Sequence, residues 1–233
     1  MTETKSLAQI ELFADLDRET LDRLEARCRW RRYKANERIL EYGSEAREVF
    51  FILEGSVHIV NTGLTGREVA FARILAGDCF GELSAIDGKP RSASAVAAEP
   101  AYVALLQAAE FHRLLEERVE VTFKVLFRLA QMVRAGDVRI MELSTLAATQ
   151  RVYAELLRMA QPDAAVDGLW VVRPLPPLRE IASRVSTTRE TVARALSQLY
   201  ADGLLRRKGR NLYLMDRDKL TGFLAASSGS KAT

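Results

Sequence analysis

The residues best suited to hold a small anion lie in one short run, from Phe80 to Ala95. Gly81 lets the backbone approach a ligand closely, and the residues after it can begin a helical turn whose free N–H groups attract an anion. Arg91 adds a planar guanidinium that matches phosphate oxygens, and Ser92 adds a hydroxyl. Glu82 can only accept hydrogen bonds, so it suits sugar hydroxyls better than phosphate. The set predicts a pocket for a phosphate joined to a sugar.

The flanking sequence indicates how such a pocket is positioned. Apolar residues before the run, from Val69 to Leu75, and after it, from Val96 to Leu105, are typical of strands. The run itself contains Gly88-Lys89-Pro90 and is too short for a long strand or helix. The alternative is a surface turn with an Arg–Glu pair, which explains any one of these residues but not the ordered set.

This run closely resembles the phosphate-binding cassette of cyclic-nucleotide-binding domains. The specific parts are Phe80-Gly81-Glu82-Leu83-Ser84 and Pro90-Arg91-Ser92-Ala93. The resemblance implies a β-roll in which the cyclic phosphate meets backbone amides, the arginine and the serine hydroxyl, while the glutamate meets the ribose hydroxyl. The predicted nucleotide-binding residues in this run are Gly81, Glu82, Leu83, Ser84, Arg91 and Ser92.

The composition is that of an ordinary globular protein. A chain of 233 residues is long enough for two compact domains. No apolar run reaches the roughly 18 residues that a membrane helix needs. The segment Met1–Lys5 has no apolar signal core behind it, which predicts a cytoplasmic protein without a membrane partner. Cys28 and Cys79 fit no metal motif, and a cytosolic pair is usually reduced.

Charge is distributed unevenly along the chain. From Gln150 to the end there are 14 Lys and Arg against 8 Asp and Glu, a net charge of +6, whereas the rest has 20 against 23, or −3. A basic C-terminal part joined to an acidic N-terminal part suggests nucleic-acid binding at the C-terminal end.

The N-terminal half shows short elements separated by turns. Residues 10–29 predict short helices, with Asp17 as a cap before Leu21, Leu24 and Cys28 on one face. Residues 30–106 then show brief apolar runs separated by turns such as Glu54-Gly55, Thr65-Gly66 and Ala76-Gly77-Asp78. Short strands at regular intervals with Gly turns predict an antiparallel roll or barrel.

Residues 110–146 contain no Pro and have a helical apolar rhythm. Two sets of residues recur every seven positions: Leu126, Val133, Ile140 and Ala147, and Leu129, Gly136 and Leu143. Such a seam is typical of a two-stranded coiled coil, so the helix predicts a homodimer. The alternative is a single long helix packed on its own roll. Gly136 either lets two backbones approach or leaves room for something between them.

Two short helices follow near the C-terminus. Residues 178–185 and 188–199 are helical in pattern and are separated by Ser186 and Thr187. Their apolar residues can form one small core: Ile181, Ala182, Val185, Val192, Leu196 and Leu199. This layout predicts a helix-turn-helix, whose second helix enters the DNA major groove.

Polar residues on the second helix and after it could meet DNA. Arg189, Glu190 and Arg194 lie on the face opposite the small core. The alternative for the arginines is a solvated helix face, and for Glu190 a capping box with Thr187. Residues 204–214 predict a two-stranded wing with Arg206, Arg207, Lys208 and Arg210 toward phosphates. The predicted DNA-binding residues are Thr188, Arg189, Glu190, Thr191, Arg194 and Lys208.

With both motifs in place, the chain resembles the CRP/FNR transcription regulators over nearly its full length. Residues 186–194, Ser-Thr-Thr-Arg-Glu-Thr-Val-Ala-Arg, are similar to the recognition helix of the catabolite activator branch. The resemblance implies a pseudo-palindromic site with TGTGA-like half-sites. It implies an α+β chain with a cyclic-nucleotide-binding β-roll (residues 1–118), a dimerisation helix (119–147) and a winged helix-turn-helix (148–233).

One part of the match departs from that branch. There the long helix supplies adjacent Thr and Ser side chains to the adenine, and an ungapped alignment of residues 111–151 places Gly136 and Asp137 at those positions. We predict both as nucleotide-binding residues. Glycine offers no side chain, and an ionised Asp137 accepts but cannot donate hydrogen bonds. Asp137 or Arg139 could read a different purine edge, so cyclic GMP competes with cyclic AMP as the effector, as does a pocket that switches nothing.

The remaining features argue against other classes. Two isolated Cys do not make the iron–sulfur cluster of the FNR branch, and His58 and His112 are expected to be surface or packed residues, not haem ligands. No catalytic set, metal spacing or P-loop is present, so we predict neither an enzyme nor a metal site. We expect a homodimeric regulator that binds double-stranded DNA and a cyclic nucleotide, and that meets RNA polymerase. A regulatory subunit of an enzyme or channel is the alternative from another class, but it leaves the helix-turn-helix unexplained.

Overall fold

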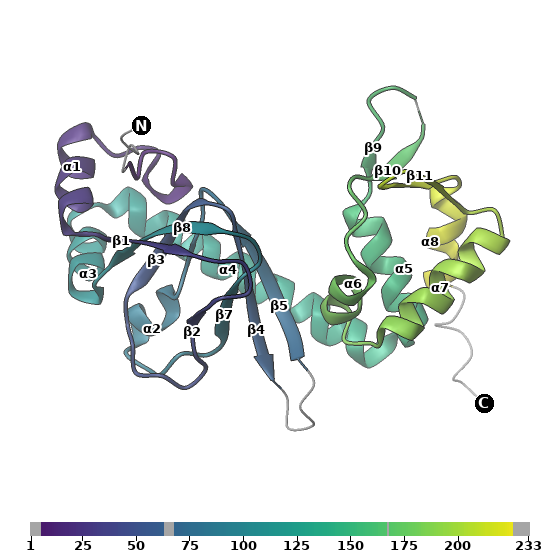
Figure 1. Ribbon diagram of the computed structural model, residues 1–233, viewed down its shortest axis with the longest axis horizontal. Coiled ribbons are helices and arrows are strands. Elements are labelled where there is room, and N and C mark those ends of the chain that lie inside the picture. The colour runs from purple at the N-terminus through teal and green to yellow at the C-terminus, as the bar shows by residue number, and fades with distance from the viewer. Residues whose placement is uncertain (1–5, 63–67, 167, 226–233) are drawn as a thin grey trace. The chain divides into compact units, whose positions relative to one another are not determined.

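The computed structural model describes residues 6–62, 68–166 and 168–225 (Figure 1). The chain divides into two compact units, Met1–Met132 and Val133–Thr233. The first is built on β-sheets, the second on helices with a small sheet, and a long helix contributes to both, so the predicted α+β class is confirmed. The domain limits predicted at residues 118 and 147 stay predictions. The predicted turn at Thr65-Gly66 and the segment Met1–Lys5 lie outside the described residues.

Two four-stranded antiparallel sheets form the roll of the first unit, as predicted. One has the order β1 (Arg29–Tyr33), β8 (Ala101–Leu106), β3 (Val49–Glu54) and β6 (Cys79–Phe80). The other has the order β2 (Arg38–Leu40), β7 (Ser94–Ala97), β4 (Ser56–Thr62) and β5 (Glu68–Leu75).

Strand β3 shows why this part of the chain is so apolar. It is buried on both faces, so its sequence Val-Phe-Phe-Ile-Leu is a continuous run without alternation. Phe50 and Ile52 belong to the core that includes residues of both sheets, whereas Phe51 packs with the N-terminal helices. Gly55 follows with φ of +80°, and a Cβ there would lie 2.3 Å from the carbonyl oxygen of Pro100. Only glycine fits this turn.

Short helices pack against the roll. They are the 3-10 helix η1 (Glu11–Phe13), α1 (Arg18–Arg27), α2 (Glu82–Asp87) and α3 (Ala108–Glu117). The predicted cap of α1 is confirmed, because the carboxylate of Asp17 accepts a hydrogen bond of 2.8 Å from the backbone N–H of Thr20.

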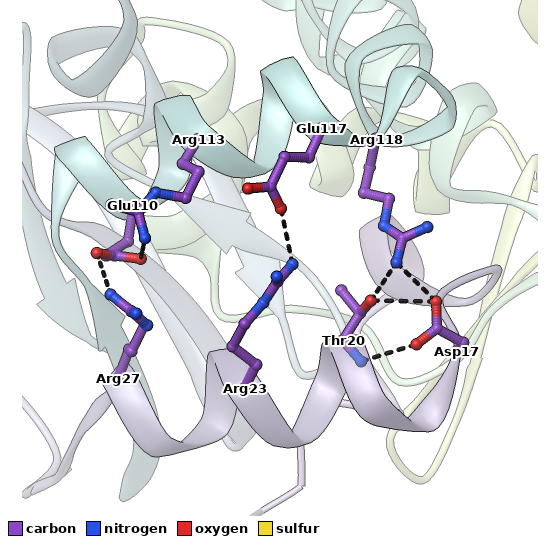
Figure 2. A network of polar contacts seen from close by, with 8 residues as sticks. All are labelled: Asp17, Thr20, Arg23, Arg27, Glu110, Arg113, Glu117 and Arg118. Carbon is purple, nitrogen blue, oxygen red and sulfur yellow. Dashed lines mark hydrogen bonds and ion pairs between the residues drawn. The ribbon is translucent and has the colours of Figure 1, made fainter.

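The helical pattern of residues 110–146 is divided between two helices, because the chain breaks at Arg118. Helix α3 ends there and α4 (Val119–Thr145) begins, with Arg118 at φ −129° and ψ 89°. The Arg118 guanidinium donates to Asp17 at 2.8 Å and also contacts Thr20 (Figure 2). Ion pairs Arg23–Glu117 and Arg27–Glu110 continue this line of contacts between α1 and α3 (Figure 2). Contacts with α1 thus accompany a break that neither Pro nor Gly marks.

One face of α4 is apolar and exposed among the described residues. Leu126, Val133 and Ile140 of the predicted seam are 54%, 64% and 66% exposed. Further exposed apolar residues of α4 are Val119, Phe123, Phe127, Met132, Val138, Met141 and Leu143. The alternative of a helix whose seam is buried on its own roll is wrong for these three positions. Leu129 alone of the seam packs against the roll's core.

The second unit is a helical domain with a four-stranded sheet. Its helices are α5 (Ala148–Met159), α6 (Leu178–Arg184), α7 (Arg189–Ala201) and α8 (Arg217–Ala225). The sheet has the order β11 (Leu205–Lys208), β12 (Asn211–Leu214), β10 (Trp170–Val172) and β9 (Gln161–Pro162). The predicted small core of the helix-turn-helix is confirmed, and all six of its residues are buried. Helix α5 ends at Met159, and Gln161 and Pro162 pair with β10 as strand β9.

Candidate nucleotide and DNA sites

Gly81 lies between β6 and α2, where the chain leaves the sheet. Phe80 of β6 pairs with Phe50 of β3, and Gly81 then takes a left-handed conformation with φ of +82° before α2 begins. A Cβ at this position would lie 2.7 Å from Nη1 of Arg91 and 3.1 Å from the carbonyl oxygen of Glu48. Both the backbone angle and the close neighbours therefore require glycine here.

Arg91 reaches across the turn to the same glycine. Its Nη1 donates to the carbonyl of Gly81 at 2.6 Å, and its Nη2 donates to the carbonyl of Glu48 at 2.7 Å. The side chain is only 2% exposed, and its guanidinium lies over the ring of Phe50 at 5.7 Å. Arg91 is thus fixed in position by the backbone of two segments.

The same guanidinium keeps an unused donor. No hydrogen-bond partner among the described residues meets the buried Nε of Arg91. Burial lowers the pKa of Arg91, against the opposing effect of Glu48 and Glu82, yet an arginine stays protonated at neutral pH. A buried N–H without an acceptor is rare in proteins and is explained when a ligand or a water accepts from it.

The other predicted residues of the cassette differ in their exposure. Ser84 is buried, and its carbonyl accepts from the N–H of Gly88 at the end of α2. Leu83 is half-buried and Ser92 is exposed. The structure thus brings Gly81, Glu82 and Arg91 together, and their ligand contacts stay predictions.

Glu82 opens α2 and is buried, with 4% of the residue exposed. Its Oε1 lies 3.5 Å from Nε of Arg128 on α4. Arg128 also donates from Nη2 to the carbonyl of Cys79 at 2.7 Å and contacts the carboxylate of Asp78 through Nη1. This guanidinium partly neutralises the buried carboxylate that we predicted to meet a ribose.

Gly136 and Asp137 lie on α4, in the part that belongs to the second unit. A Cβ at Gly136 would meet no atom of the described chain within 4 Å, apart from its own helix. Asp137 is exposed. Arg139 donates to the hydroxyl of Ser186 at 3.0 Å. The predicted nucleotide contacts of Gly136 and Asp137 stay predictions.

In the second unit, the start of α7 corrects one hypothesis. The N-cap of α7 is Thr188, whose hydroxyl accepts from the N–H of Thr191 at 3.2 Å. The capping box between Thr187 and Glu190 is therefore wrong, since Thr187 lies one position too early and is buried.

The polar face of α7 is open. Arg189, Glu190 and Arg194 are exposed, and Arg194 donates to the hydroxyl of Thr191 at 3.4 Å. Hydrogen bonds from its own backbone N–H and from the hydroxyl of Thr188 lower the pKa of Glu190, so this carboxylate is ionised at neutral pH. The face presents two guanidiniums and one acceptor.

The wing follows as predicted. Strands β11 and β12 form a hairpin in which Lys208 pairs with Asn211, and Gly209 takes φ of +60° at its tip. Arg206, Lys208 and Arg210 are exposed without a polar partner among the described residues, whereas Arg207 donates to the carbonyl of Gly209. The hairpin thus presents unpaired cations suited to phosphates.

Known families match the two units separately. The cyclic nucleotide-binding domain family matches residues 30–118, and the Crp-like helix-turn-helix domain family matches residues 150–223. The cAMP-activated global transcriptional regulator Vfr of Pseudomonas aeruginosa is 33% identical over 199 residues, which cover 82% of this chain and 92% of that protein. The chain belongs to the CRP/FNR family of transcriptional regulators.

Other CRP/FNR proteins support this assignment. The cyclic AMP receptor protein of Thermus thermophilus is 31% identical over 84% of this chain and 88% of its own length. The solved structure of FixK2 from Bradyrhizobium japonicum has 28% identity and a TM-score of 0.66 over 88% of this chain and 99% of that chain. The cassette (residues 80–95) lies within the first family match, and the helix-turn-helix (residues 178–199) lies within the second.

Sequence reasoning missed two residues outside the cassette that contact it. Glu48 offers its backbone carbonyl to Arg91, and Arg128 approaches Glu82 from α4. Neither residue is marked by a local spacing, because each lies tens of residues from its partner in the sequence. From the sequence alone, Arg128 is expected to be a solvated residue on a helix surface.

The described residues lack two other kinds of feature. No group of three or more His, Cys, Asp or Glu side chains there is placed to hold a metal ion. In the same part of the chain, no helix is both long enough and apolar enough to cross a bilayer.

Proposed function

We propose that this CRP/FNR regulator binds a cyclic nucleotide at Arg91 and that the bound nucleotide controls how a homodimer binds double-stranded DNA. The observation that carries the proposal is the guanidinium of Arg91, which is held at the backbone of Gly81 while its Nε meets no acceptor in the described part of the chain. A cyclic phosphate can accept from this donor and from the backbone at the start of α2. The ribose hydroxyl can donate to Glu82.

We propose cyclic AMP as the effector. Support comes from the names of relatives, such as the cAMP-activated regulator Vfr and the cyclic AMP receptor protein. Cyclic GMP or another effector is the second candidate, because Gly136 has no side chain and Asp137 cannot donate when it is ionised. A family member that binds DNA without a ligand is the third.

The homodimer is supported by the exposed apolar face of α4. Side chains such as Phe123, Phe127 and Ile140 are each about two-thirds exposed, at 66%, 67% and 66%. An apolar helix face of this length is buried against another helix in stable proteins, and a second copy of α4 offers the matching seam. Leaving it in water would also favour aggregation.

The DNA contact is supported by the polar face of α7 and by the wing. Arg189 and Arg194 can each pair with a guanine, and Glu190 can accept from the exocyclic amine of a cytosine. The proposed half-site is TGTGA-like, repeated as an inverted pair. In a dimer the two recognition helices would then meet sites about 34 Å apart, one turn of DNA.

Nucleotide binding can influence DNA binding only if the ligand has different affinities for two arrangements of the dimer. Titration calorimetry with cyclic AMP and cyclic GMP tests the site, using the wild type, Arg91→Lys and, as a control, the exposed Arg113→Lys. We expect the cassette variant to lose roughly 10- to 100-fold in affinity, since the charge-assisted contact that Nε of Arg91 offers the phosphate is lost. The control should bind like the wild type.

DNA titrations with and without the nucleotide complete the test. We expect tighter binding to a duplex with two inverted TGTGA half-sites in the presence of the effector. Equal affinities under both conditions would refute the switch. We further propose a cytoplasmic regulator that meets RNA polymerase and has no enzymatic activity, as the transcription-regulator relatives suggest.

A further inference from the structure

Ser186 occupies the turn of the helix-turn-helix in an unusual conformation. Its φ is +52°, a region that residues with a Cβ rarely adopt and that glycine adopts freely. The residue stands two positions before Thr188, the N-cap of the recognition helix α7. The conformation of Ser186 therefore sets the direction in which α7 leaves the turn.

The hydroxyl of Ser186 is held from another helix of the same unit. Nη2 of Arg139, on α4, donates to it at 3.0 Å. Arg139 is half-buried, and this hydroxyl is its one acceptor in the described chain. A serine in a glycine-like position thus supplies the acceptor that glycine could not.

A second arginine holds the backbone of the turn. Arg151 of α5 donates from Nε to the carbonyl of Val185 at 2.9 Å and from Nη2 to the carbonyl of Ser186 at 3.3 Å. Its Nη1 donates to the carbonyl of Leu146, just after α4, at 2.9 Å. One guanidinium therefore joins the end of α4 to carbonyls that α6 leaves without helical partners.

A chain of ion pairs runs beside these contacts. Arg158 of α5 contacts Glu142 of α4 and the buried Glu155. Glu155 also accepts from Arg184 of α6 at 3.2 Å. Helices α4, α5 and α6 are thus joined by two sets of contacts, the ion pairs and the hydrogen bonds of Arg139 and Arg151. Of these two sets, only the hydrogen bonds of Arg139 and Arg151 reach the turn before α7.

We infer that Arg139 is a positioning residue for the recognition helix: through the hydroxyl of Ser186 it couples the second half of α4 to the orientation of α7. The inference rests on the proposed function, because it explains how a change along α4, the helix proposed to pair in the dimer, reaches the DNA-reading face. In the proposed complex Arg139 itself touches no base. It sets the direction of Arg189 and Arg194.

The substitution Ser186→Gly separates positioning from stability. Glycine suits the φ of the turn, so it relieves the backbone conflict while it removes the acceptor of Arg139. If Ser186 has only a structural role, this variant should be at least as stable as the wild type and should bind DNA equally well. If the contact positions α7, the variant should be stable and yet bind its target duplex more weakly.

The test is a double-mutant cycle with Arg139→Ala and Ser186→Gly in the full chain. We measure affinity for a duplex with two inverted TGTGA half-sites and for a scrambled duplex at one salt concentration. Each single variant should reduce the ratio of the two affinities roughly three- to tenfold, as expected for one charge-assisted hydrogen bond. The double variant should reduce this ratio no more than either single variant does. Arg134→Ala, an exposed arginine of the same helix, is the control.

The inference would be overturned if the two substitutions reduced the ratio of affinities additively. It would also be overturned if the Ser186→Gly variant kept the wild-type ratio. Amide hydrogen exchange without DNA or nucleotide gives an independent readout, since loss of the contact should speed exchange at residues 186–189 in both single variants but not in the control. Unchanged exchange there also overturns the inference. If the wild type binds DNA equally well with and without the nucleotide, but the double-mutant cycle still shows coupling between Arg139 and Ser186, only the proposed switch is refuted.

Discussion

Nε of Arg128 on α4 lies 3.5 Å from Oε1 of Glu82, the first residue of α2. The carboxylate side chain is 5% exposed, and its guanidinium partner also contacts Asp78 and the carbonyl of Cys79. A ribose hydroxyl that donates to Glu82 would share this carboxylate with Arg128. The helix proposed to form the dimer is therefore in direct contact with the predicted sugar-binding residue, within one compact unit.

This contact predicts the effect of Glu82→Gln. The amide keeps the shape of the side chain but loses the charge, so the ribose hydroxyl would lose a charge-assisted acceptor and Arg128 would lose its ion pair with Glu82. We expect affinity for cyclic AMP to fall roughly tenfold, which corresponds to about 1.4 kcal/mol. Calorimetry measures this, with the exposed Glu116→Gln as the matched control. Wild-type affinity in the Glu82 variant would show that this carboxylate does not meet the ligand.

The elements that the sequence predicts well are those whose signals are local. The two helices around Ser186, the wing and the antiparallel roll follow from apolar spacing and Gly turns within short segments. Helix α8 was not predicted, although Asp216 before it accepts from the N–H of Lys219 at 2.8 Å and is a capping signal that could have indicated it.

Contacts between distant segments could not be predicted in the same way. The break at Arg118 is accompanied by contacts with Asp17, 101 residues away, and nothing in the local sequence marks it. Arg128 approaches Glu82 only because the fold of the first unit brings α4 next to the cassette. The cassette could be predicted as a set of residues, but the burial of Arg91 and its bonds to backbone carbonyls could not.

The two thiols are predicted to be unreactive in the folded protein. Burial raises the pKa of Cys28 to about 12, with a further contribution from Glu25, and burial also raises the pKa of Cys79. Thiols of an unfolded chain ionise near pH 8.5. Above this pH the unfolded chain has therefore lost the thiol protons that the native protein still holds. The stabilisation from this difference is present below about pH 8.5 and is lost as pH rises toward 12.

Alkylation with iodoacetamide at pH 8, followed by mass spectrometry, checks this. We expect slow labelling of both residues in the native protein and rapid labelling in urea. Rapid native labelling of Cys79 would contradict its burial at 2% exposure.

The apolar face of α4 predicts the effect of a charge at the seam. Val133 is 64% exposed in the described chain and would be buried in a dimer. In Val133→Asp an unpaired carboxylate would enter that interface, at a cost of several kcal/mol. We expect a monomer at micromolar concentration by analytical ultracentrifugation, with the roll still able to bind nucleotide. Leu75→Asp, at a 56% exposed position of β5, is the control and should sediment like the wild type. A dimeric Val133 variant would place the interface elsewhere.

Arg189 and Lys208 predict two different signatures in DNA binding. Arg189 lies in the first turn of α7, so a bidentate contact with a guanine would make Arg189→Ala lose about 1–3 kcal/mol at one base pair. Lys208, at the end of β11, has no polar partner in the described chain and is expected to meet phosphate. Lys208→Ala should weaken binding to all sequences alike and reduce the salt slope by about 1.

Fluorescence anisotropy with duplexes changed one base pair at a time, each at several salt concentrations, separates the two. Arg207→Ala is a comparison within the wing, because that side chain already donates to the carbonyl of Gly209 at 3.1 Å. We expect it to change the salt slope less than Lys208→Ala does. An Arg189 variant that weakens every duplex equally would show that this arginine meets the DNA backbone and reads no base.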